Sequence, residues 1–108
     1  MSGSAPSSPE RLVAAAFKAL GEPLRLAIVD ALRAGERTVS ELVGATGSAQ
    51  ANVSKHLQIL HGAGLVRRRR SGLYTCYSLS DPDVAAICDL MSRRIDGARS
   101  VAADPAGT

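Results

Sequence analysis

The sequence predicts one mainly α-helical domain with a small β-hairpin, in the order of four helices, two strands and a final helix. Apolar residues recur at helical spacing in five segments, Gly or Pro stands at the ends of those segments, and one stretch alternates about a short turn. A chain of 108 residues fits a single domain. Its hydrophobic content is 45% and it has only three aromatic residues, so its core is small and pairing with a second copy would enlarge it.

Pro and Gly bound the first two predicted helices. Pro9 suits the first turn of a helix, and Gly21 ends the apolar stripe that follows it. Pro23 opens a second helix in the same way, and Gly35 closes it. The two stripes consist of Leu12, Val13, Ala16, Phe17 and Leu20, and of Leu24, Ala27, Ile28, Ala31 and Leu32.

Two further helices flank a tight turn. Thr38 and Glu41 have the spacing of a capping box, in which each side chain bonds the other residue's backbone amide at the start of a helix. Gly47 ends this short helix, and a longer one runs from about Ala49 to Gly62. A short helix, a turn that contains Gly and a longer helix with one polar face are typical of the helix-turn-helix motif. The apolar face of the longer helix carries Ala49, Val53, Leu57 and Leu60, and its outer face carries Ser48, Ala51, Asn52, Lys55 and Gln58.

The segment after this helix predicts a β-hairpin, which completes a winged helix-turn-helix fold. Residues 65–70 and 73–79 are extended runs on either side of Ser71-Gly72, which we expect to form the turn. Alternation gives each strand two faces. On the first strand, one face carries Arg67 and Arg69 and the other carries Arg68 and Arg70. On the second strand, one face carries Leu73, Thr75, Tyr77 and Leu79, and the other carries Tyr74, Cys76 and Ser78.

A final helix and two tails complete the predicted organisation. Asp81-Pro82 supplies an N-cap and a first-turn Pro. Residues 1–8 and 97–108 have the composition of flexible tails, which leaves residues 9–96 as the winged helix-turn-helix domain. The final helix carries Val84, Ile87, Cys88, Met91 and Ile95.

Nothing in the sequence resembles a signal peptide or a membrane span. The longest apolar run, residues 12–17, is far shorter than the roughly 20 residues that cross a bilayer. We therefore expect a cytoplasmic protein without a membrane partner, in which Cys76 and Cys88 are reduced. Because no nucleophile–base pair, phosphate-binding Gly loop or metal cluster emerges, we expect no enzymatic activity.

Basic residues without carboxylates fill the middle of the chain. Between Leu42 and Ser80 lie Lys55 and residues 67–70, five basic side chains with no Asp or Glu among them. The other eight basic residues stand against all ten carboxylates, a net charge of −2 outside this segment, although the whole chain carries +3. Phosphates dominate the affinity of proteins for nucleic acids, so this segment predicts double-stranded DNA as the partner.

Landmarks of the middle segment resemble a known family. Residues 48–66 are similar to the recognition helix of the ArsR/SmtB winged-helix repressors, with the Ser, His-Leu, Leu and Ala-Gly-Leu-Val landmarks in register. Residues 19–26 resemble the start of that family's second helix, and Gly72 and residues 77–79 stand where its wing ends. The resemblance covers roughly residues 9–95. It implies a homodimer that binds a two-fold operator and represses transcription, in many members until a metal ion or an oxidant binds.

The outer face of the longer helix and the wing form the predicted DNA-binding surface. An α-helix fits the major groove, where Asn52 and Gln50 suit adenine and Lys55 suits guanine or phosphate. The alternative is a polar face that is only solvated. His56 points closer to the apolar side, which favours a structural role, and the wing arginines suit flanking phosphates or a narrow minor groove. The full set is Ser48, Gln50, Ala51, Asn52, Ser54, Lys55, Arg67, Arg68, Arg69, Arg70 and Tyr74.

One such helix contacts only a few base pairs, so we expect a two-fold dimer with the two helices one DNA turn apart. The stripes of the first and last helices remain available once the helix-turn-helix core is filled. We expect them to pair, although Phe17 and Leu20 could also fold into the core of one chain. The predicted interface consists of Leu12, Ala16, Phe17, Val84, Ile87, Cys88, Met91 and Ile95.

The metal sites of the resembling family are not matched. Residues 39–45, where relatives carry a cysteine pair, contain no thiol or imidazole. Asp81 matches the first ligand of a second site, but Asp83, Arg94 and Gly97 stand at the other ligand positions. A capping role explains Asp81, and we expect no metal site and no cofactor.

Two questions stay open from the sequence. Cys76 and Cys88 are candidate sensor thiols for an unidentified metal or oxidant. A buried cysteine at helical spacing with apolar residues, as Cys88 is with Val84, Ile87 and Met91, is however more often a small hydrophobic residue than a sensor. The basic wing also fits a protein of a different class, a protein-interaction module that grips an acidic partner and has no specific DNA site. A steep salt dependence and a preferred palindrome would distinguish a DNA-binding repressor from that module.

Overall fold

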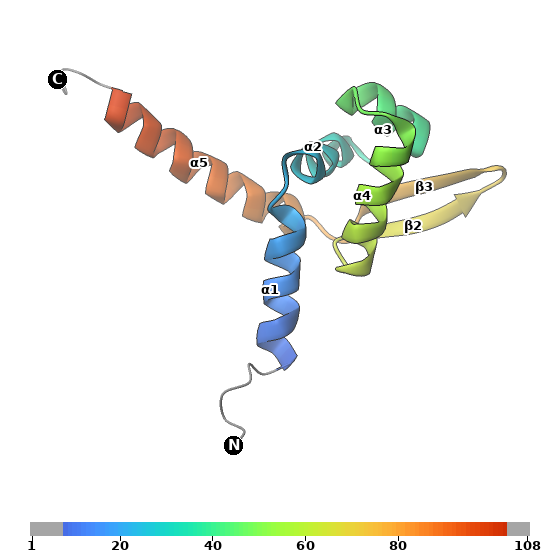
Figure 1. The fold of residues 1–108 in the computed structure, drawn as a ribbon, viewed down its shortest axis with the longest axis horizontal. Coiled ribbons are helices and arrows are strands. Elements are labelled where there is room, and N and C mark those ends of the chain that lie inside the picture. The colour runs from blue at the N-terminus through green and yellow to red at the C-terminus, as the bar shows by residue number, and fades with distance from the viewer. Residues whose placement is uncertain (1–7, 104–108) are drawn as a thin grey trace.

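The computed structural model describes residues 8–103, and within them five α-helices accompany a small antiparallel sheet (Figure 1). Four helices precede a hairpin and one follows it, so the predicted order of elements is confirmed. The elements are α1 Ser8–Leu20, α2 Pro23–Ala31, the 3₁₀ turn η1 Leu32–Ala34, β1 Arg37–Thr38, α3 Val39–Thr46, α4 Gln50–Gly62, β2 Val66–Ser71, β3 Tyr74–Leu79 and α5 Asp83–Ala103.

Local signals in the sequence define the two ends of α3. The Thr38 hydroxyl accepts a hydrogen bond from the Glu41 amide at 3.1 Å, and the Glu41 carboxylate accepts one from the Thr38 amide at 2.8 Å. Gly47 adopts a left-handed φ of 74°, and its amide donates to the Val43 carbonyl at 2.9 Å. These bonds satisfy backbone groups that a helix end otherwise leaves unpaired, and the predicted capping box is confirmed.

The sheet contains a strand that the sequence analysis missed. β1 pairs with β3, with Arg37 opposite Tyr77 and Thr38 opposite Cys76, so the strand order is β1-β3-β2. A strand of two residues is too short to show an alternating pattern, which explains why it escaped prediction.

The hairpin turn lies one residue later than expected. Ser71 pairs with Tyr74, so Gly72 and Leu73 form the turn in place of Ser71-Gly72. Gly72 has a φ of 62° at the first central position, as a type II′ turn requires, and this requirement places the turn around it. Leu73 is 90% exposed at the tip of the wing.

The last helix extends further than the sequence indicated. α5 continues to Ala103, whereas we expected a loose tail from residue 97. One Gly inside a helix costs only about 1 kcal/mol, and the Ala-rich segment that follows favours helix. The expected tails at residues 1–7 and 104–108 lie outside the described residues, and Ser8 is the first residue of α1.

One core joins all the helices to the base of the hairpin, while most of α1 and α5 extends away from this body (Figure 1). Within the described part of the chain, no helix combines the length and the apolarity that crossing a lipid bilayer requires. The buried cluster consists of Leu20, Ile28, Val29, Leu32, Leu42, Val53, Leu57, Leu60, Val66, Tyr77 and Val84.

Candidate nucleic-acid interface

α4 turns one face to the core and the other to solvent. Val53, Leu57 and Leu60 on the inner face are fully buried. Ser48, in the turn before α4, and Ser54, within the helix, are partly exposed. Since the inner face alone secures the helix to the body, the outer face is available to a ligand. Its exposed residues are Gln50, Ala51, Asn52, Lys55 and Gln58.

His56 lies on the inner side of α4, and the structural role predicted for it is confirmed. It is 8% exposed, and its Nδ1 lies 2.9 Å from Nη1 of Arg25. Because arginine only donates hydrogen bonds, this nitrogen of the imidazole is the acceptor. Arg25 also donates from Nε to the Ala19 carbonyl at 2.5 Å, so it connects the end of α1 to α4.

Glu22 completes this cluster at the start of α2. Its carboxylate accepts hydrogen bonds from the amides of Arg25 at 3.1 Å and Leu24 at 2.5 Å, and it lies 3.9 Å from Nε2 of His56. The hydrogen bond from the Arg25 amide, together with that from the Leu24 amide and the charge of Arg25, holds the pKa of Glu22 below its ordinary value despite the desolvation of the carboxylate. No local pattern in the sequence indicates this cluster, because Arg25 and His56 are 31 residues apart.

The wing carries its four arginines on alternate faces, as predicted, and all four are exposed. Arg68 and Arg70 share the face of Tyr77, which packs into the core with side chains of α4. Arg67 and Arg69 share the opposite face. Of the four, only Arg68 and Arg70 therefore lie on the side of the sheet that α4 covers.

Arg69 has a carboxylate partner that the sequence did not indicate. Its Nε donates to Oε2 of Glu36 at 2.9 Å and its Nη2 donates to Oε1 at 2.5 Å. These bonds lower the pKa of Glu36 and raise the pKa of Arg69. Within the described part of the chain, none of the other three wing arginines has a carboxylate within salt-bridge distance. Tyr74, also predicted to contact DNA, is 65% exposed beside the turn.

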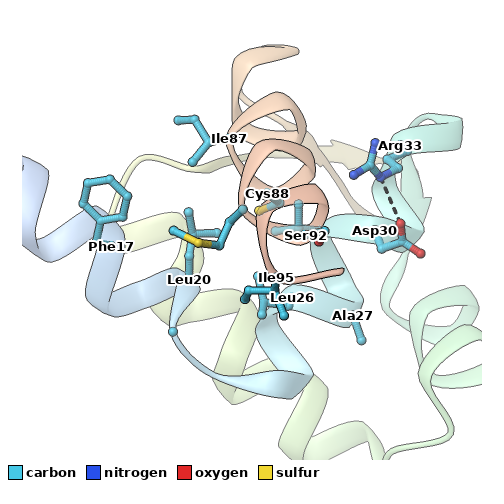
Figure 2. Close-up of a pocket in the computed structure, with 13 residues that line it drawn as sticks. Phe17, Leu20, Leu26, Ala27, Asp30, Arg33, Ile87, Cys88, Ser92 and Ile95 are labelled. Atoms are coloured by element: carbon cyan, nitrogen blue, oxygen red, sulfur yellow. Dashed lines mark hydrogen bonds and ion pairs between the residues drawn. The ribbon is translucent and has the colours of Figure 1, made fainter. Parts of the chain in front are cut away.

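The apolar stripes of α1 and α5 face solvent in a single chain. Part of each stripe lines a groove of about 520 Å³ between α1, α2 and α5, and Phe17 of α1 and Ile87 of α5 are among its lining residues (Figure 2). Exposed apolar side chains that gather around one groove are typical of an interaction site, whereas single exposed apolar residues are not. The exposed large apolar residues of the two helices are Leu12, Val13, Phe17, Ile87, Leu90, Met91 and Ile95.

Val84 corrects one part of the predicted dimer interface. It is 5% exposed within one chain, because the first turn of α5 lies against the core, and it is not available to a partner. Leu20 is also buried in that core, whereas Phe17 remains 57% exposed. Ala16 and Cys88 are partly exposed, and Cys88 packs against the core.

An ion-pair network connects α5 to α2 and to the η1 turn that follows α2. Arg33 donates from Nε to Asp30 at 2.9 Å, and from both terminal nitrogens to the carboxylate of Asp89 in α5 (Figure 2 shows the bond to Asp30). The bonds from Arg33 hold the pKa of Asp89 below its ordinary value. No local pattern in the sequence indicates this network, because 56 residues separate Arg33 from Asp89.

The thiols lie apart from any cluster of metal-ligand side chains. Among the residues that the structure describes, no group of three or more His, Cys, Asp or Glu could hold a metal ion. Cys76 and Cys88 are both free, and Cys76 is 9% exposed. Burial raises the pKa of the Cys88 thiol, which favours its protonated form. Asp81 accepts a hydrogen bond from the Asp83 amide at 2.7 Å at the start of α5, which agrees with a capping role.

This geometry defines a winged helix-turn-helix domain, in which α3 and α4 form the motif and β2 and β3 form the wing. The model of a family described as "Bacterial regulatory protein, arsR family" matches residues 22–68, from the start of α2 into the wing. The chain belongs to the ArsR family, as the resemblance of its middle segment implied.

Individual relatives agree with this membership. The "Probable mercury resistance operon repressor" of Streptomyces lividans is 41% identical over 90 residues, which cover 83% of this chain and 66% of that protein. The "HTH-type transcriptional repressor SmtB" of Mycobacterium tuberculosis is 46% identical over 71 residues, which cover 66% of this chain and 53% of that protein. The chain thus spans between about half and two thirds of these relatives.

A solved structure extends the likeness to the whole fold. The homodimeric winged helix-turn-helix DNA-binding domain of a possible ArsR-family transcriptional regulator from Mycobacterium bovis is 36% identical. The aligned region covers 89% of this chain and 91% of the Mycobacterium bovis chain, with a TM-score of 0.74.

Proposed function

We propose that the protein is a homodimeric transcriptional repressor that binds double-stranded DNA at an operator with inverted-repeat symmetry. The observation that carries this proposal is the outer face of α4, where Gln50, Asn52 and Lys55 are exposed within a segment that has no carboxylate. The amide side chains suit the donor and acceptor pattern of adenine in the major groove, and Lys55 suits guanine or a phosphate. The protein acts in the cytoplasm and catalyses no reaction.

The wing supports the same surface. Arg68 and Arg70 lie on the side of the sheet that α4 covers, so they would reach the DNA backbone or the minor groove beside the α4 contact. Ser48 and Ser54 at the flanks of α4 suit phosphate oxygens. The major-groove helix and the wing thus offer base contacts and backbone contacts on one side of the domain.

The exposed stripes of α1 and α5 support pairing. One α4 contacts only a few base pairs, whereas a two-fold dimer places two copies about 34 Å apart, one turn of DNA, and multiplies the affinity. Burying Phe17, Met91 and Ile95 against a second copy would remove apolar surface that one chain leaves in water. The related Mycobacterium bovis domain is described as homodimeric.

Footprinting of the DNA upstream of the protein's own gene tests this function. We expect the purified protein to protect an inverted repeat whose half-sites lie one helical turn apart. A protein-interaction module would instead show no preferred DNA sequence. The proposal is wrong if no double-stranded fragment is bound even at low ionic strength.

A thiol-reactive inducer would act through Cys88. This residue lines the groove between α2 and α5, next to Asp89 of the ion-pair network, so a group added to its thiol would occupy the groove beside that network. We expect Cys88→Ser to keep its DNA affinity and to lose any release that an oxidant or a thiophilic metal causes. Release that persists in this variant excludes Cys88 as the sensor.

A further inference from the structure

The four consecutive arginines of the wing are not equivalent in the structure. We propose that Arg69 is a positioning residue which forms a strut with Glu36, and that Arg68 and Arg70 supply the phosphate contacts of the wing. The strut is the bidentate ion pair between these two side chains and it holds the wing in place relative to the helices. The inference rests on the proposed DNA-binding function and assigns separate roles within that site.

The strut crosses the central strand of the sheet. Glu36 directly precedes β1 and Arg69 lies in β2, and these are the two edge strands on either side of β3. Cys76 of β3 is opposite both Thr38 of β1 and Arg69 of β2, so its side chain lies on the face that the strut crosses. Cys76 itself is only 9% exposed.

The strut connects the wing to the start of the helix-turn-helix motif. Thr38, two residues after Glu36, is the N-cap of α3. A two-stranded hairpin is only marginally stable by itself in water, so a wing that extends beyond the body needs contacts at its base. An ion pair between β2 and the segment that opens α3 provides such a contact and couples the direction of the wing to the motif.

The geometry of Arg69 suits a fixed contact better than a mobile one. Its Nε and Nη2 donate to the two oxygens of one carboxylate, at 2.9 and 2.5 Å. This two-point arrangement uses the planar fork of the guanidinium and restrains both side chains. Arg69 also lies on the face opposite to that of Tyr77, away from a duplex held by α4. Arg68 and Arg70, on the other face, have no such carboxylate among the described residues.

The salt dependence of operator affinity separates the two roles. Each neutralised phosphate contributes about −0.9 to the slope of log affinity against log salt, so Arg68→Ala should make the slope of a dimer shallower by about 1.8. Arg69→Ala should leave the slope unchanged and weaken the binding of a dimer by no more than about 30-fold, since each of its two exposed ion pairs contributes at most about 1 kcal/mol. The double variant Glu36→Gln with Arg69→Ala should bind no more weakly than Arg69→Ala alone.

Glu36→Gln gives the sharpest contrast because the two explanations predict opposite signs. Removal of a carboxylate beside a polyanion should tighten binding if only charge matters, whereas loss of the strut should weaken it. Asp96→Asn is the matched control, since it removes one carboxylate from α5 far from the wing. Exchange of the two charges, by Glu36→Arg with Arg69→Glu, should restore most of the wild-type affinity, which a phosphate contact at position 69 could not allow. Thermal unfolding of each variant shows that it is folded at the temperature of the assay.

Three results would contradict the positioning role of the strut without contradicting DNA binding. They are a shallower slope in Arg69→Ala that equals that of Arg68→Ala, tighter binding by Glu36→Gln, and an exchange variant as weak as Arg69→Ala. If the exchange variant does not fold, the single variants alone decide between the roles. A wild-type protein that binds no double-stranded fragment would instead contradict the proposed function, and the strut would fall with it.

Discussion

The motif and wing, residues 38–79, and the terminal helices α1 and α5 bury apolar surface in different ways. In the first region Val53 and Leu57 are fully buried within one chain, and the outer face is polar and free of carboxylates from Leu42 to Ser80. In the second region Phe17 and Met91 are more than half exposed. A small domain that presents one polar face to DNA can thus complete its core by pairing through another face.

The energetic consequence differs between the two regions. Burial of a Leu, Phe or Met side chain contributes about 1.5 to 3 kcal/mol relative to leaving it in water. Within the motif this contribution is already made inside one chain, so it stabilises the fold. On α1 and α5 it is available only when a second chain binds, so it stabilises the dimer.

The largest expected effect follows from disruption of the terminal helices. The double variant Phe17→Asp with Met91→Asp should be monomeric, because charged groups would replace apolar ones that line the groove. Loss of the second domain should lower affinity for an inverted repeat by about 100-fold or more, while affinity for a half-site stays the same. Light scattering and operator titration measure both effects.

Ala14→Asp is the matched control for this experiment, since Ala14 is exposed on α1 outside its apolar stripe. This variant should remain dimeric. If Phe17→Asp with Met91→Asp stays dimeric as well, the interface lies elsewhere.

A core substitution should distinguish stability within one chain from stability that depends on pairing. Leu57→Ala should lower the free energy of unfolding by about 2 to 5 kcal/mol at every protein concentration, because Leu57 is fully buried within one chain. Leu12→Ala, at a residue 72% exposed in one chain, should lose its effect at dilutions where the dimer dissociates. Urea unfolding at several protein concentrations measures these free energies. A loss of unfolding free energy in Leu12→Ala that does not depend on protein concentration would contradict the prediction.

A smaller effect is expected on the outer face of α4. Lys55→Ala should cost about 1 to 3 kcal/mol of operator affinity if Lys55 contacts a base, and should relax the sequence preference there. Lys18→Ala removes an equal charge from α1 and should leave operator affinity nearly unchanged. Equal losses in the two variants would show that only net charge matters.

The smallest expected effect is the acid dependence of stability. The pKa values of Asp89 and Glu36 are held below their ordinary values of 3.8 and 4.5, by Arg33 and by Arg69. Between the lowered and the ordinary pKa the unfolded chain binds more protons, so stability is present above this window and is lost as pH falls through it. Urea midpoints from pH 3 to 6 should decrease on acidification, and Asp89→Asn should flatten the decrease. Greater stability at pH 3 than at pH 6 would contradict this sign.

Features that depend on residues close together in the sequence were predictable. The capping box of Thr38 and Glu41, the two faces of α4 and the alternation of the wing arginines follow from spacing alone, and the structure confirms them. Each depends on residues within one helix or one strand, where the backbone fixes which side chains share a face. The family landmarks lie in the same segments.

Features that depend on distant residues were not predictable. Arg69 meets Glu36 across 33 residues, and Arg33 meets Asp89 across 56, so no local pattern indicates either pair. Val84 has the spacing of the exposed α5 stripe, yet the first turn of that helix lies against the core. Periodicity identifies which residues share a face, but tertiary packing decides what covers that face.

The salt dependence of binding to double-stranded DNA tests the central claim most directly. If Lys55, Arg68 and Arg70 of both chains each neutralise one phosphate, log affinity should fall against log salt with a slope of about −5. The monomeric variant Phe17→Asp with Met91→Asp should show about half that slope. A wild-type slope near zero, or no binding at low salt, would contradict a basic, carboxylate-free surface that acts in two copies on one duplex.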